Sequence, residues 1–68
     1  MRMIHVDSSN LSSVGYENGN LYITFNSGAT YCYFNVPEAI YRGLLAAGSK
    51  GRYHADFIKN SYPYRRIG

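Results

Sequence analysis

The chain has 68 residues, a net charge of +3 at pH 7, and eight Tyr, three Phe and no Trp. A chain of this length forms one domain, residues 1–68, and its small core argues against a large enclosed active site. The single cysteine, Cys32, excludes an internal disulfide and a cysteine-based zinc site. Residues 1–20 contain no apolar run of the length that a signal peptide or a membrane span requires, so we expect a cytoplasmic protein.

The first half of the chain alternates between strand patterns and turn residues. Residues 3–6 predict a short edge strand, and residues 11–16 predict a second strand. Asn18-Gly19 readily takes the two positive φ angles of a type I′ turn, which predicts a hairpin to the period-two strand at residues 21–25. Gly28 suits the left-handed position of the next turn. The pattern is that of an antiparallel meander.

The next strand, residues 30–34, is apolar on both of its faces. Tyr31 and Tyr33 share one face, and Cys32 and Phe34 share the other. We expect Cys32 and Phe34 to face the core and the tyrosines to cover the opposite side of the sheet. If the helices pack on the tyrosine face, this assignment is reversed.

The second half of the chain is helical. Pro37 suits a first helical turn and predicts a helix over residues 37–47, with Gly48 after its end. Ser49 is a candidate cap for a second helix over residues 52–61, and residues 62–68 form a basic tail. The predicted fold is therefore α+β, with a three- to four-stranded antiparallel β-meander at residues 3–35 followed by two helices.

No combination of residues indicates catalysis. His5 and His54 are far apart in sequence and lack a third ligand at metal-binding spacing, so no metal and no cofactor are predicted. Cys32 lies in the middle of a strand among bulky aromatics, where a thiol behaves as a small inert hydrophobe. We expect a protein that is not an enzyme.

The positive charge is concentrated in the C-terminal half. Residues 1–40 carry one cation and three carboxylates, a net charge of −2, whereas residues 41–68 carry six cations and one carboxylate, a net charge of +5. Stacking on an exposed ring contributes about 1–3 kcal/mol per base, and cations contact phosphates. The candidate nucleic-acid-binding residues are five of these six cations and two tyrosines near them: Lys50, Arg52, Tyr53, Lys59, Tyr64, Arg65 and Arg66.

Gly48-Ser49-Lys50-Gly51 matches the G-x-x-G loop with which KH domains clamp a nucleic-acid backbone. A capped, flexible hinge between two helices explains the same four residues. The predicted order of strands followed by helices also differs from the KH order. We therefore favour the hinge.

An ordered set of short motifs covers nearly the whole chain: Ser8-Ser9, Gly15-Tyr16, Leu21/Ile23/Phe25 with Gly28, Tyr31-Cys32-Tyr33, Val36-Pro37, Leu44, Ala47, Ser49, Gly51-Arg52-Tyr53, Ile58 and Tyr62-Pro63-Tyr64-Arg65. This set resembles the KTSC domain, a family that occurs at the C-terminus of some lysyl-tRNA synthetases and as small bacterial and phage proteins. The resemblance implies a small α+β module of unknown biochemical function, for which RNA binding has been suggested. His54-Ala55 departs from the resemblance, because family members often have an aromatic residue and then Asn there.

Two functional hypotheses follow. The first is an RNA- or nucleic-acid-binding module that uses the basic, Tyr-rich C-terminal half, with affinity that falls steeply with salt. The second is a protein-interaction domain that docks through an exposed Tyr31/Tyr33 face or a strand edge. Neither hypothesis involves a membrane, and the oligomeric state is left open.

Overall fold

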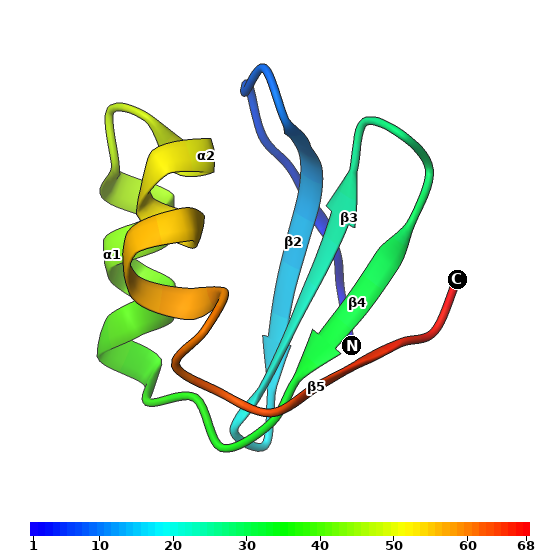
Figure 1. Ribbon diagram of the computed structural model, residues 1–68, viewed down its shortest axis with the longest axis vertical. Coiled ribbons are helices and arrows are strands. Elements are labelled where there is room, and N and C mark those ends of the chain that lie inside the picture. Colours follow the sequence, from blue (N-terminus) through cyan, green and yellow to red (C-terminus); the bar gives the residue numbers. More distant parts are fainter.

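A five-stranded antiparallel sheet carries all of the helical segments on one of its faces (Figure 1). The computed structural model describes residues 1–68. The strands are β1 (Ile4–His5), β2 (Leu11–Glu17), β3 (Asn20–Phe25), β4 (Thr30–Tyr33) and β5 (Tyr64–Arg66). The helical segments are α1 (Glu38–Ala46), α2 (Lys50–Tyr53) and the π-helical turn η1 (His54–Ile58). The predicted α+β class is confirmed, with more strands than expected.

The strands lie in the sheet in their sequence order, β1-β2-β3-β4-β5. Asn18 and Gly19 have φ angles of 53° and 81°, as the predicted type I′ turn requires, and they join β2 to β3. Gly28, with a φ of 98°, closes the turn between β3 and β4. The turn chemistry of the sequence therefore explains how β2, β3 and β4 are connected.

The fifth strand was not predicted. Residues 64–66, expected as part of a basic tail, pair antiparallel with β4 and form an edge of the sheet. All three residues of β5 are exposed, so no alternation of apolar and polar residues marks the strand. Its pairing partner, β4, precedes all of the helical segments in the sequence. A pattern of neighbouring residues cannot reveal a pairing over that separation.

The tyrosine face of β4, and not the Cys32 face, packs against the helices. Tyr33 lies opposite Leu21 in the register and Tyr31 lies opposite Ile23, which places both tyrosines on the same face as the buried residues of β3. Tyr33 is 3% exposed and belongs to the main core cluster. The expectation that Cys32 and Phe34 face the core is therefore wrong.

The opposite face of the sheet is partly covered by the start of the chain. Gly15 lies in β2 beneath Met1 and Met3: a Cβ at residue 15 would be 2.7 Å from the Met3 sulfur and 3.1 Å from the Met1 sulfur. Cys32 is on this face, opposite Tyr22 and Arg65, and is only 4% exposed. It is therefore a buried free thiol outside the helix-side core.

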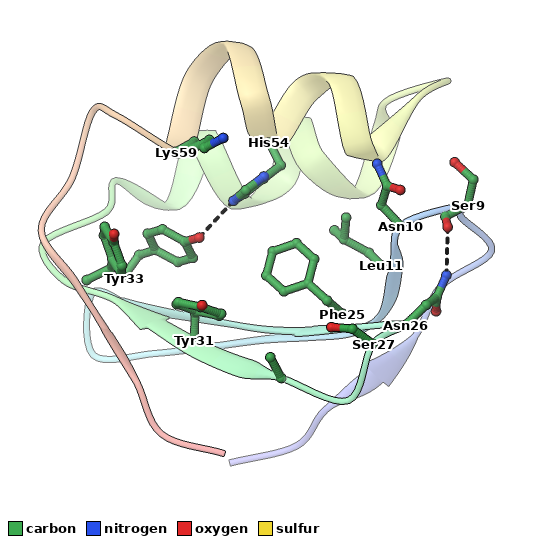
Figure 2. A pocket seen from close by; sticks show the side chains of 12 residues that line it. Ser9, Asn10, Leu11, Phe25, Asn26, Ser27, Tyr31, Tyr33, His54 and Lys59 are labelled. Atoms are coloured by element: carbon green, nitrogen blue, oxygen red, sulfur yellow. Dashed lines mark hydrogen bonds between the residues drawn. The ribbon is translucent and has the colours of Figure 1, made fainter.

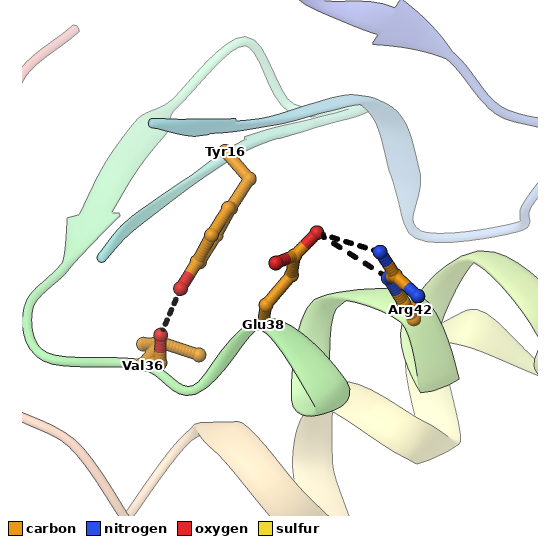
Figure 3. A network of polar contacts seen from close by, with 4 residues as sticks. All are labelled: Tyr16, Val36, Glu38 and Arg42. Atoms are coloured by element: carbon orange, nitrogen blue, oxygen red, sulfur yellow. Dashed lines mark hydrogen bonds and ion pairs between the residues drawn. The ribbon is translucent and has the colours of Figure 1, made fainter. Parts of the chain in front are cut away.

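The corner between β4 and α1 is held by two hydrogen bonds and one ring stack, and Figure 3 shows the bond between Tyr16 and Val36. Asn35 adopts a left-handed φ of 56°, which Asn tolerates better than most residues. The Val36 amide then donates to the Gly19 carbonyl at 2.8 Å, and the Tyr16 hydroxyl donates to the Val36 carbonyl. The Tyr16 ring also stacks on Tyr41 of α1, with centroids 5.2 Å apart. These contacts fix the direction in which α1 crosses the sheet.

The second helical segment starts earlier and ends earlier than predicted. It covers residues 50–58 and not 52–61, and the Ser49 side chain caps it by accepting from the Arg52 amide at 3.4 Å. Gly48 has no positive φ, so it is not the left-handed residue expected after α1. The Lys50 ammonium donates to the Ala47 carbonyl at 3.1 Å instead, which satisfies a carbonyl at the end of α1. No helix has the length and apolar character needed to cross a membrane.

Candidate functional site

A cleft of about 470 Å³ lies between the sheet and the α2–η1 segment (Figure 2). Its lining residues come from β2, β3, β4, β5, η1 with the residue after it, Lys59, and the turns at residues 9–10 and 26–29. Figure 2 shows His54 and Lys59 on the helical side, with Phe25 and Tyr31 on the sheet side. Residues far apart in the sequence therefore meet at one site.

The sheet side of the cleft is a set of aromatic rings in mutual contact. Phe25 meets Tyr31 edge to face, with centroids 5.7 Å apart, and meets His54 in the same way at 5.1 Å. Tyr64 of β5 lies 5.7 Å from Tyr31 and 5.6 Å from Tyr33. Tyr33 is buried, whereas Tyr64 is 57% exposed. The rings thus run from the core to the surface.

A hydrogen bond between Tyr33 and His54 closes one end of the cleft. The Tyr33 hydroxyl and His54 Nε2 are 2.8 Å apart in a buried setting. Burial, and then the neighbouring tyrosines Tyr31 and Tyr64, raise the pKa of Tyr33 to about 12. Burial, and then the charge of Lys59, lower the pKa of His54 below its ordinary value. At neutral pH the two side chains are therefore an uncharged pair.

The lowered pKa of His54 predicts a domain that loses stability in mild acid. The unfolded chain binds a proton at His54 near pH 6.5, whereas the folded chain resists protonation until a lower pH. The contribution of His54 to the free energy of unfolding is therefore fully present above about pH 6.5. It is lost as the pH drops through the folded pKa, by at most about 1.4 kcal/mol per pH unit. Urea denaturation across this range measures the loss.

The two histidines provide a matched pair for this test. His54→Phe should remove most of the decline in stability between about pH 7 and pH 5, because its ring cannot bind a proton. His5→Phe, at an exposed position of β1, should leave the decline unchanged. An identical pH profile for the wild type and His54→Phe would contradict the assignment.

The only charged side chain that lines the cleft is Lys59, if His54 is counted as neutral. Arg66 lies opposite Tyr31 in the register and so belongs to the same face of the sheet; its Nε donates to the Gly68 carbonyl at 2.8 Å. No Asp or Glu lines the cleft. An anionic ligand in the cleft would therefore meet Lys59, with Arg66 on the same face of the sheet, and no opposing carboxylate.

The other residues predicted to bind nucleic acid lie elsewhere. Arg65 is on the opposite face of the sheet, across from Cys32. Arg52 is 82% exposed on α2, where it pairs with Asp56 at 3.4 Å. Tyr53 packs against the core and lies so close to Gly43 of α1 that a Cβ there would be 2.8 Å from its Cζ. Tyr53 is therefore not free to stack on a ligand.

Sequence reasoning missed the two asparagines of the cleft. The Asn26 side-chain amide donates to the Ser9 carbonyl at 2.9 Å and the Asn26 backbone amide donates to the Asn10 carbonyl at 2.8 Å. These bonds hold two turns together that are far apart in sequence. The Asn10 side-chain amide rests on Gly51, where a Cβ would be 2.6 Å from Nδ2. Asparagine is common in turns, so the sequence gives no reason to single out either residue. Only the folded structure shows that Asn10 and Asn26 line the same cleft.

Comparison with known proteins agrees with this fold. A model of the KTSC domain matches residues 7–62. The chain belongs to the KTSC domain family. The crystal structure of a KTSC domain protein from Yersinia pestis is similar over 98% of this chain and 97% of that one, with a TM-score of 0.95 and 38% sequence identity. The predicted resemblance is confirmed.

Relatives of this KTSC domain include short proteins and parts of long ones. An uncharacterised protein of Stutzerimonas stutzeri is 40% identical over 98% of this chain and 99% of its own length. A lysine–tRNA ligase of Trichormus variabilis is 33% identical over 96% of this chain, but the match spans only 12% of the ligase. The description of the KTSC domain names no catalytic activity, and the ligase shares only this small part of its length with the chain. The KTSC match ends before Tyr64, which contributes the exposed ring of the cleft.

Proposed function

We propose that this KTSC domain is a non-catalytic RNA-binding module that holds single-stranded RNA across the open side of the cleft. The position of Tyr64 carries the proposal: its ring is 57% exposed, lies 5.7 Å from Tyr31, and shares the cleft with Lys59. Proteins that bind single strands combine stacking rings with cations that follow the backbone. This cleft has both, and no carboxylate lines it.

The cations divide into two groups under this proposal. Lys59 and Arg66, with Tyr64, are the primary contacts, because they lie at the cleft or on its face of the sheet. Lys50, Arg52 and Arg65 contact only an RNA that extends beyond the cleft. A longer or folded RNA should therefore bind more tightly than a short single strand.

Two further observations support RNA as the ligand. Residues 41–68 carry a net charge of +5, which favours a polyanion over a neutral ligand. Relatives of the domain include lysine–tRNA ligases, proteins whose name specifies tRNA as a substrate. A cytoplasmic location, where such RNA is available, is part of the proposal.

The test is a salt-dependent titration of the purified domain with labelled single-stranded RNA and with a folded tRNA. We expect affinity to fall as salt rises, with a log–log slope of about −0.7 for each single-strand phosphate contact. Lys59→Ala and Arg66→Ala should each weaken binding and reduce the slope by about that amount. Arg42→Ala is the matched control, because Arg42 is exposed on α1 and does not line the cleft.

Some results would count against the proposal. Binding that does not depend on salt would contradict it, as would an equal loss of affinity in Arg42→Ala and Lys59→Ala. Circular dichroism of each variant separates lost binding from lost folding.

A protein-interaction role is the second candidate, and the free edge of β5 favours it. β5 ends the sheet, and all three of its residues are exposed, so a partner strand can pair with its open side. The alternative surface suggested by the sequence, an exposed Tyr31/Tyr33 face, is contradicted by the 3% exposure of Tyr33. Partner binding that is nearly insensitive to salt would favour this second role.

A further inference from the structure

The end of the cleft away from Tyr33 is polar and is formed by amide side chains. Figure 2 shows Asn10 and Asn26 at this end, with Phe25 and Tyr31 between them and Tyr33. The Asn26 amide nitrogen is occupied by the Ser8 and Ser9 carbonyls. The Asn10 side chain makes no hydrogen bond within the protein, although its backbone is held on both sides. The Asn10 amide therefore has hydrogen-bonding capacity that no protein group uses, with its Nδ2 lying against Gly51 at the edge of the cleft.

The remaining walls suit a flat ring that carries an anionic substituent. The volume of about 470 Å³ is within the range of about 300–1,000 Å³ that small-ligand pockets occupy. Phe25 and Tyr31 are only partly buried, and their planes are 83° apart, so a ring stacked on one of them lies nearly perpendicular to the other. Figure 2 shows Lys59 beside His54, at the end of the cleft opposite Asn10.

We infer that the cleft takes one unstacked nucleobase of the bound RNA, with its ring against Phe25 and Tyr31, its polar edge at Asn10 and its phosphate at Lys59. This inference rests on the proposed function and deepens it, because it assigns a place to a single base. A side-chain amide forms paired hydrogen bonds with adenine, and adenine also has a large surface for stacking. Adenine is therefore the base to test first.

The experiment compares a short oligoadenylate with an abasic ribose-phosphate oligomer of the same length and charge, in competition for the wild-type domain. We expect the oligoadenylate to bind about tenfold more tightly or better, the value of one stacked base. Asn10→Ala should lower only the affinity for the oligoadenylate. Lys59→Ala should lower both affinities by a similar factor. Asn60→Ala is the matched amide control, since Asn60 is exposed and lies outside the cleft.

The outcomes separate this inference from the function on which it rests. Equal, salt-dependent binding of both oligomers overturns the base pocket and leaves RNA binding in place. Loss of affinity for both oligomers in Asn10→Ala, with folding intact, also overturns the base pocket. If neither oligomer binds at low salt, where electrostatic affinity is greatest, both the pocket and the proposed function are overturned.

Discussion

Replacing Tyr33 with alanine is expected to lower the free energy of unfolding by about 3–5 kcal/mol, the usual cost of removing a large buried ring. Tyr33 is 3% exposed, contacts the rings of Tyr31, His54 and Tyr64, and binds His54 through its hydroxyl. Small domains are stable by about 5–15 kcal/mol, so the variant loses much of its stability. Urea denaturation of the purified variant measures the change.

Two further variants divide the effect of Tyr33 into its parts. Tyr33→Phe keeps the ring and should cost about 1–3 kcal/mol, because His54 Nε2 then lacks a partner. Tyr64→Ala, at a ring that is 57% exposed, should cost much less than Tyr33→Ala. A Tyr33→Ala protein as stable as Tyr64→Ala would show that the tyrosine face of β4 does not face the core.

Leu44→Ala is expected to destabilise the domain by about 2–5 kcal/mol. Leu44 is the only fully buried residue of α1, and its side chain anchors the helix in the core beside the partly buried Ile40 and Tyr41. Truncation leaves a cavity at the contact between the helices and the sheet. Chemical denaturation followed by circular dichroism measures the loss.

Ile67→Ala is the control for this loss. It also removes aliphatic carbons, but from a side chain that is 51% exposed. Its expected effect is within about 0.5 kcal/mol, as for most surface substitutions. Similar effects of Leu44→Ala and Ile67→Ala would mean that α1 does not pack on the sheet through Leu44.

The elements that could be predicted are those with local causes. Asn18 and Gly19 accept positive φ angles at little steric cost, so their turn could be located without knowledge of the rest of the chain. Pro37 precedes α1, and the Ser49 side chain caps α2. Steric preferences and short-range hydrogen bonds decide these features, and both act over a few residues.

The buried face of β4 could not be predicted in the same way. Cys32 and Tyr33 are both nearly buried, at 4% and 3% exposure, so the strand has two apolar faces and no alternation that identifies the core. The tyrosine face has a buried polar partner on the helical side, because the Tyr33 hydroxyl lies 2.8 Å from Nε2 of His54. In the sequence, His54 is marked only by the absence of a metal-binding partner and by its departure from the family pattern, and its position beside Tyr33 depends on how η1 packs.

The candidate site was predicted only in part for a similar reason. The basic, Tyr-rich half of the chain does contribute Lys59 and Tyr64 to the cleft. However, Arg65 and Arg66 are adjacent in the sequence and belong to opposite faces of the sheet, because β5 is a strand and not a flexible tail. Charge counted along the sequence cannot distinguish these positions.

The order of the strands has a consequence for how the domain opens. Each of β1 to β4 pairs with the next strand along the chain, whereas β5 is separated from its partner β4 by the whole segment from Phe34 to Pro63. Pairing over such a separation carries the largest entropic cost of chain closure, so we expect β5 to be the last strand to join the sheet. Because β5 is also a short, exposed edge strand, we expect it to separate from β4 readily when the structure opens locally. Tyr64 leaves with it, so the cleft can lose one of its walls while the rest of the domain stays folded.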